Sequence, residues 1–216
     1  MVPEILRAHL ALLDETLSRT VVTGQVDTKV SGSKAAPLIT GAVLTARIVS
    51  NRAMVADFIV WRCQWCPLDR LEHFAILSTL AHLAGAGMFP RGLFRDWDYD
   101  PSRHGTQSLA PLIPAREVQV ETLLLMDRVL ELRSIDAEAE GLRMVSSIEW
   151  ELSVGPLHPF YDACGRISRY YSTLLCLWKD LPLARHKTRD AYFRAARAGR
   201  DAFADYYRTA AIETDS

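Results

Sequence analysis

The sequence predicts an all-α domain, and three observations support that prediction. Apolar residues recur at the three-to-four spacing of a helix through most of the 216 residues. Most of the 11 glycines and 10 prolines fall between these periodic segments, where such residues end helices. No internal repeat and no linker rich in Gly, Ser or Pro divides the chain, so we predict a single domain over residues 1–216.

Composition excludes several classes of protein. A hydrophobic content of 49% with 24% charged residues excludes a disordered chain. A net charge of −1 argues against a nucleic-acid binder, and no apolar run approaches the length of a membrane span. Four cysteines without a secretory signal indicate a reducing compartment, so we expect a cytoplasmic protein. Export as an effector through a non-cleaved signal stays open.

The N-terminal part reads as helices separated by one irregular segment. Residues 3–18 form an amphipathic pattern that opens with a proline, whereas residues 20–34 are rich in Val, Thr, Gly and Ser without a helical period. Residues 37–61 are apolar and compatible with a helix. Pro67 opens a further helix to about residue 84. Its core candidates are Leu68, Leu71, Ala75, Leu80 and Leu83.

The C-terminal part begins with a long irregular stretch, residues 89–114, within which residues 106–113 could pair as a short hairpin. The helix predicted next has a core face that includes Val120 and Leu124. The predicted helices after the irregular stretch cover residues 116–132, 137–154, 167–179 and 189–209.

One segment contains a concentration of chemically active side chains. Directly after the Gly155-Pro156 stop, residues 158–169 read HPFYDACGRISR. Small residues at a helix start let backbone N–H groups converge on an anion, and the helix dipole adds to that attraction. Arg166 and Arg169 are three residues apart, so on a helix they would share a face and could clamp phosphate oxygens.

Two further side chains complete the set for phosphoryl or nucleotidyl transfer. Asp162 could hold a divalent cation that bridges phosphate oxygens. Histidine titrates near neutral pH, so His158 could act as a general base.

The same residues resemble the signature of the Fic (filamentation induced by cAMP) family, H-P-F-x-[D/E]-G-N-G-R-x-x-R. Seven of its nine specified positions are present, and Ala163 and Cys164 replace the family's Gly-Asn. The order of elements upstream is also similar, so the resemblance covers a core of about residues 68–180. Residues 1–60 would then be an N-terminal extension.

The resemblance implies a Fic-type helical bundle with a small β-hairpin flap before the motif. It implies transfer of AMP from Mg-ATP, the donor substrate, to a Tyr, Thr or Ser hydroxyl of a target protein. In that reading His158 is the catalytic base, Asp162 binds Mg²⁺ and Phe160 anchors the loop in the core. The flap, near Thr106 to Leu112, would hold the target chain by strand addition.

The resemblance also assigns the donor site. The backbone of Ala163, Cys164 and Gly165 would line the anion hole, and Arg166 and Arg169 would hold the outer phosphates. A thiol is a weaker donor than the amide of the family's Asn. Three readings therefore remain: a weakened adenylyltransferase, a transferase with another donor (another NTP or a CDP-linked group) or a small-molecule acceptor, and a degenerate binding module.

Regulation and the remaining motifs are less informative. The family's inhibitory pattern, [S/T]-x-x-x-E-[G/N], is approached at Glu140-Gly141, but Asp136 stands at the Ser/Thr position. Restraint would then come from a separate inhibitory partner or be unnecessary. Cys63 and Cys66 form a lone C-x-x-C without two further zinc ligands, so we interpret them as buried or half-buried thiols.

Overall fold

The computed structural model describes residues 2–17, 41–67, 69–84, 94–95, 98, 111–160 and 163–212. In these ranges the chain is mostly helical, and its single sheet-like feature is an isolated antiparallel bridge between Phe94 and Phe160. The predicted all-α class is confirmed for this part of the chain. The irregular segment expected at 20–34 and nearly all of the expected hairpin at 106–113 lie outside it, while residues 111–113 have no regular structure.

The helices follow the predicted order along the chain. They are α1 (Val2–Leu17), α3 (Gly41–Arg62), α4 (Arg70–Ala84), α6 (Val118–Glu131), α7 (Glu138–Ser153), α8 (Cys164–Trp178), α9 (Arg189–Ala198) and α10 (Arg200–Ile212). Short 3₁₀ turns, Ala115–Glu117 and Leu132–Ser134, flank α6. None of the helices in the described ranges is long and apolar enough to cross a membrane.

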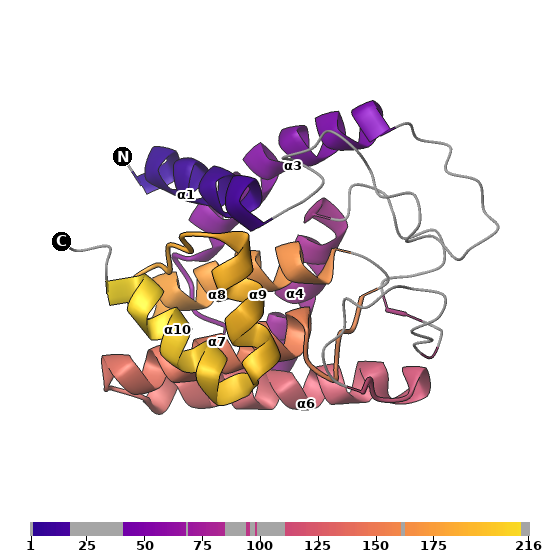
Figure 1. Ribbon diagram of the computed structural model, residues 1–216, viewed down its shortest axis with the longest axis vertical. Coiled ribbons are helices and arrows are strands. Elements are labelled where there is room, and N and C mark those ends of the chain that lie inside the picture. Colours follow the sequence, from indigo (N-terminus) through magenta and orange to yellow (C-terminus); the bar gives the residue numbers. More distant parts are fainter. Residues whose placement is uncertain are drawn as a thin grey trace.

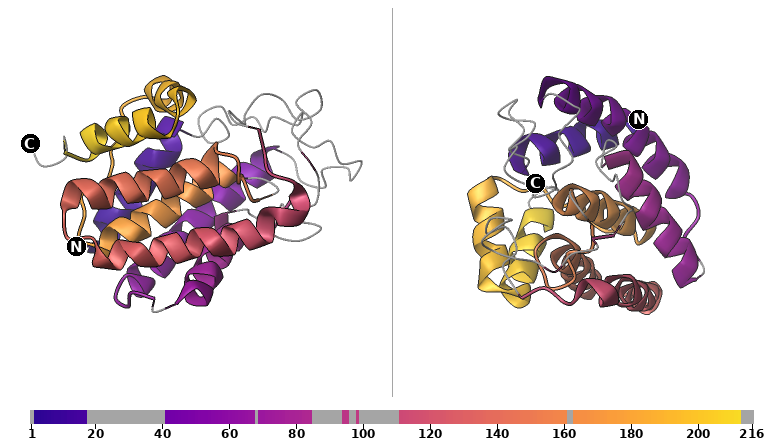
Figure 2. Two further views of the ribbon diagram at one scale, coloured as in Figure 1. Left: turned by 90° about the horizontal axis from the view of Figure 1, so that it is seen from below. Right: turned by 90° about the vertical axis from the view of Figure 1, so that its right-hand side faces the viewer.

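Helix α8 lies at the centre of the bundle (Figure 1). It runs antiparallel to α7 (Figure 2), and α6 packs against α4 and touches α7. Helices α1, α3 and α4 contact α8 from one side, whereas α9 and α10 cover α7 from the other. Every residue from Arg166 to Cys176 is buried, so α8 is enclosed on all faces.

Hydrogen bonds between distant segments fix the helices around α8. The indole Nε1 of Trp178 donates to the Arg62 carbonyl at 3.1 Å, which ties the end of α8 to the end of α3. The Nε1 of Trp150 donates to the Ala196 carbonyl, also at 3.1 Å, and joins α7 to α9. Each indole is largely buried and has its single N–H paired, as buried tryptophans require.

The predicted core faces of α4 and α6 are partly wrong. Leu71 is 63% exposed, Val120 58% and Leu124 48%, although Leu80 is buried as expected. Both helices have apolar side chains on more than one face, and their partners decide which face is covered. On α4 the buried face comprises His73, Ile76, Leu77, Leu80, Ala81 and Ala84.

Several helix boundaries also differ from the prediction, and α4 begins at Arg70 and not at Pro67. Helix α8 begins at Cys164, three residues before the predicted start, because Ala163 adopts the left-handed conformation (φ 61°) and acts as its N-cap. The single helix predicted at 189–209 is two helices, α9 and α10. The break is at Gly199. Its backbone angles, φ 110° and ψ 177°, do not occur in an α-helix.

Candidate functional site

The segment HPFYDACGRISR lies in the connection from α7 to α8 and the first turns of α8. A tight turn ends α7, where the Gly155 N–H donates to the Trp150 carbonyl at 2.8 Å. A Cβ at Gly155 would lie 2.8 Å from the Glu151 Cα, so only glycine fits there. The chain then returns along the end of α7, and the His158 N–H donates to the Glu151 carbonyl at 3.2 Å.

The ring of His158 has a defined orientation. Its Nδ1 lies 2.7 Å from the carbonyl oxygen of Ser153, the last residue of α7. A carbonyl oxygen can only accept, so Nδ1 carries the proton and the neutral ring has Nε2 as its basic atom. The backbone of His158 has a φ of 32°, which is unfavourable for a residue with a side chain. The fold therefore holds His158 in a conformation that the isolated chain would avoid.

Phe160 anchors the loop, as the sequence suggests. It is 1% exposed and its ring stacks on Phe94, with ring centres 5.9 Å apart and planes 18° apart. The two residues also form the isolated antiparallel bridge. Tyr161 and Asp162 lie outside the described residues, so the predicted Mg²⁺ ligand stays a prediction.

The start of α8 has the small residues expected of an anion site. The N–H groups of Arg166 and Ile167 both donate to the Ala163 carbonyl at 2.9 Å, which closes the first turn. N–H groups earlier in such a turn have no partner inside the helix and carry the positive end of its dipole. Ala163, Cys164 and Gly165, the predicted lining of the anion hole, occupy this position.

Cys164 points inward, away from solvent. It is 3% exposed, and its Sγ donates to the Phe160 carbonyl at 3.4 Å. A thiolate could not donate this hydrogen bond, so the contact favours the neutral thiol. Cys164 therefore makes an internal contact in the loop and presents no side-chain donor outward.

The two arginines are more buried than the clamp hypothesis expects. Arg166 is 7% exposed and Arg169 3% exposed. Among the residues that the structure describes, Arg166 Nη1 and Arg169 Nε have no hydrogen-bond partner. A buried guanidinium nitrogen without an acceptor is costly, so each of these nitrogens would gain from an anionic partner. A Cβ on Gly165 would lie 3.1 Å from Arg169 Nη1, which places that guanidinium under the first turn.

Arg169 also faces a buried carboxylate. Glu149 on α7 accepts hydrogen bonds from Ser172 Oγ at 2.6 Å and from the Tyr192 hydroxyl at 2.8 Å. Burial raises the pKa of Glu149, while these two hydrogen bonds and the charge of Arg169 oppose that rise. Glu149 therefore places a buried carboxyl group close to Arg169, and no sequence pattern marks it.

A small polar cavity lies beside Arg169, on the side of α8 that faces His9 and His186. Its volume open to the centre of a water molecule is about 10 Å³. A cavity of this size holds a single water molecule and is far smaller than a small-molecule site, which has a few hundred Å³ or more. Neither His158 nor Cys164 lines it. Arg169 is the predicted donor-site residue that lines this cavity, which otherwise belongs to the core.

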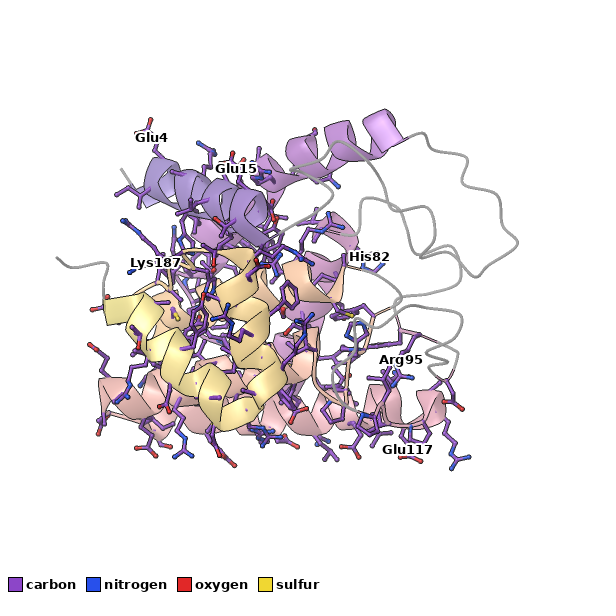
Figure 3. The ribbon with its side chains drawn as sticks, in the orientation of Figure 1. Glu4, Glu15, His82, Arg95, Glu117 and Lys187 are labelled. Carbon is purple, nitrogen blue, oxygen red and sulfur yellow. The ribbon has the colours of Figure 1, made fainter. Side chains whose placement is uncertain are left out.

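The structure also reveals a residue that the sequence reasoning missed. Arg95 lies beside the loop between α7 and α8 (Figure 3), and its side chain donates to three backbone carbonyls there. The sequence signal was weak: a single arginine beside Phe94 inside a stretch read as irregular.

The C-x-x-C pair lies at the end of α3. Cys63 is half-buried and donates to the Val60 carbonyl at 3.2 Å, whereas Cys66 is exposed, contrary to the expectation of two buried or half-buried thiols. In the described ranges no three His, Cys, Asp or Glu side chains gather as a metal site.

No family model, no curated protein sequence and no solved structure matches the chain.

Proposed function

We propose that this protein is a Fic-like transferase that moves AMP from Mg-ATP to a Tyr, Thr or Ser hydroxyl of a target protein. The observation that carries the proposal is the orientation of His158. Its Nδ1 donates to the Ser153 carbonyl, so Nε2 is the atom that can take a proton. The same short loop continues into the first turn of α8, where an anion would be stabilised.

Each residue of the site has a role in this reaction. His158 removes the proton of the target hydroxyl, and that oxygen bonds to the α-phosphorus of ATP. The bond between the α-phosphorus and the oxygen that bridges it to the β-phosphate breaks, and pyrophosphate leaves with the electron pair. The first turn of α8 and the guanidinium groups of Arg166 and Arg169 stabilise the phosphate charge. The motif alone assigns the divalent cation to Asp162.

Ala163 and Cys164, the two departures from the motif, support an alternative function for the same fold. Cys164 donates inward to the Phe160 carbonyl, so this position lacks the outward amide that the family's Asn supplies. That observation favours, as second candidate, a transferase of the same fold with another nucleotide donor, a CDP-linked donor or a small-molecule acceptor. A degenerate binding module would show no affinity for Mg-nucleotides at millimolar concentration.

Label transfer tests the proposal. Purified protein, Mg²⁺ and a bacterial lysate are incubated with ATP labelled at the α- or the γ-phosphate. We expect α-label on protein from the wild type and none from His158→Ala. His82→Ala is the matched control, because His82 lies on the exposed side of α4 and should leave transfer unchanged.

The other outcomes are equally definite. Transfer that persists in His158→Ala would contradict the proposal. Label from the γ-phosphate alone would indicate phosphotransfer. Absence of both labels, with micromolar nucleotide binding retained, would favour the second candidate and call for a screen of donors.

A further inference from the structure

Arg95 is an almost completely buried arginine that binds backbone. It is 1% exposed, and its Nε donates to the His158 carbonyl at 3.1 Å. Its Nη2 donates to the Ile113 carbonyl at 2.6 Å and lies 3.4 Å from the Leu157 carbonyl. Arginines are rarely buried without a charged or hydrogen-bonding role, so this arrangement requires an explanation.

The main chain of Arg95 adds to the same contact. Its N–H donates to the Pro159 carbonyl at 3.0 Å. The carbonyls of Leu157, His158 and Pro159 are thus all bound by one residue that lies 63 positions before His158 in the chain. The planar guanidinium has five donors in a rigid fork, which suits it to gather several carbonyls at once.

These contacts hold His158, the residue of the loop whose backbone is strained. A non-glycine residue at positive φ costs about 1–3 kcal/mol and persists only where its surroundings hold it. His158, at φ 32°, is held by α7 through the Glu151 and Ser153 carbonyls and by Arg95 on its own carbonyl. Two groups of contacts therefore fix the backbone and the ring of His158 together.

We infer that Arg95 is a positioning residue: it holds the backbone of Leu157–Pro159 so that the His158 ring keeps Nδ1 on the Ser153 carbonyl and Nε2 as its basic atom. The inference rests on the proposed function for its catalytic consequence, but the orientation of the ring can be measured without any activity. Arg95 itself touches no reacting atom in this scheme.

The test uses Arg95→Lys, which keeps the positive charge and loses the planar fork. The ring nitrogens of His158 are followed by ¹⁵N NMR across pH, with His158→Ala to assign the signals. We expect the wild type to have one dominant tautomer with the proton on Nδ1. In Arg95→Lys we expect both tautomers to be populated and the ring to titrate at a different pH, because the loop no longer holds one geometry.

A kinetic readout accompanies the spectrum. A displacement of a catalytic group by about 1 Å costs roughly 100-fold in rate. We therefore expect Arg95→Lys to lower kcat by about 10- to 100-fold while KM for ATP changes less than about threefold, since in this scheme Arg95 acts through the loop that holds His158. Arg95→Ala with added guanidinium is the second variant, and guanidinium should restore the wild-type ring signals.

A matched control separates positioning from stability. Arg128 is a half-buried arginine on α6 whose Nη2 donates to Ser147 Oγ at 3.1 Å, remote in the chain from the loop. Arg128→Ala should leave the His158 signals unchanged, and an equal change in that variant would overturn the inference. Wild-type tautomer and titration in folded Arg95→Lys would overturn it as well.

The two proposals fail in different ways. If the wild type transfers no label, the proposed function fails and the NMR comparison still decides the role of Arg95. If transfer depends on His158 while Arg95→Lys leaves ring and kcat unchanged, the inference about Arg95 fails alone.

Discussion

Tyr170 on α8 donates its hydroxyl hydrogen to Oδ2 of Asp14 on α1, at 2.7 Å, across 156 residues of sequence. The same oxygen accepts from Arg52 Nε on α3 at 3.0 Å. Asp14 is fully buried, so one carboxylate joins the N-terminal helices to the helix that begins in the motif. Within the described residues its second oxygen, Oδ1, has no hydrogen-bond partner.

This network should be a large contributor to stability. Asp14→Ala would leave the Arg52 cation and the Tyr170 hydroxyl unpaired inside the core, so we expect the free energy of unfolding to fall by about 3–5 kcal/mol. Tyr170→Phe removes one donor and should cost about 1–2 kcal/mol. Urea denaturation followed by circular dichroism measures both.

A surface ion pair between the same helices is the control. Arg7 and Asp57 have side chains that are 47% and 61% exposed, so Asp57→Ala should cost less than about 1 kcal/mol. Equal losses for Asp57→Ala and Asp14→Ala would contradict a special role of the buried carboxylate.

Cys164→Asn should increase transfer of AMP. An amide in place of the thiol adds a donor close to the phosphates, and a hydrogen bond to a charged group is worth about 1.5–3 kcal/mol, or roughly 10-fold or more in rate. Initial rates of α-label transfer measure the change. Cys176→Ala is a control, because Cys176 is buried in the core at the other end of α8. A loss of transfer in Cys164→Asn would mean that the cysteine serves a different donor or acceptor.

Three buried histidines should make the fold sensitive to acid. Burial, with a further contribution from nearby arginines, lowers the pKa of His9 to about 4, of His73 to about 4 and of His186 to about 3. The unfolded chain binds these protons near pH 6.5, whereas the folded chain does not. Stability is therefore complete above about pH 6.5 and is lost as pH falls toward 4, by up to about 1.4 kcal/mol per pH unit for each histidine.

The slope of unfolding free energy between pH 6 and 5 tests this sign. His73→Gln should reduce the slope by about one proton, and His82→Gln, at an exposed position on the same helix, is the matched control. A stability that stays flat or rises toward pH 5 would show that the buried histidines are protonated in the folded state.

Gly199→Ala should destabilise the fold although the site is open. No heavy atom lies within 4 Å of a Cβ at this position, but its φ of 110° with ψ of 177° belongs to a region that essentially only glycine adopts. We expect a loss of about 1–3 kcal/mol from backbone strain. The midpoint of thermal or urea unfolding measures it.

Gly141→Ala is the matched control for that substitution. Gly141 is inside α7, and the atoms nearest to its Cβ would be those of the flexible Leu181 side chain, from 3.1 Å. The helical preference of alanine, about 1 kcal/mol, should offset the closer contact and leave stability nearly unchanged. Equal losses of stability in the two variants would contradict a special cost of the backbone conformation at Gly199.

Much of the helical layout could be predicted because it depends on local features. Helix α1 and helix α7 lie within one or two residues of their predicted ends, since apolar periodicity, Pro3 and the Gly155-Pro156 stop act over a few residues. The break at Gly199 was missed, because a glycine inside a periodic pattern is compatible with both a continuous and a broken helix.

The candidate site, too, could be predicted only in part. Motif spacing alone predicted a loop from His158 that opens a helix, and both are present, although the helix begins at Cys164 and not at residue 167. It could not predict that Arg166 and Arg169 are buried, because neighbouring helices decide the exposure of a helical side chain.

The sequence by itself determined the helices and the order of chemical groups in the motif, since bonds between near neighbours set both. Only the tertiary structure decided the tautomer of His158, the inward hydrogen bond of Cys164 and the contact of Arg95 with the loop. These depend on carbonyls and side chains that meet through the packing of α7, α8 and a segment far earlier in the chain. These interactions form only when the helices have packed together.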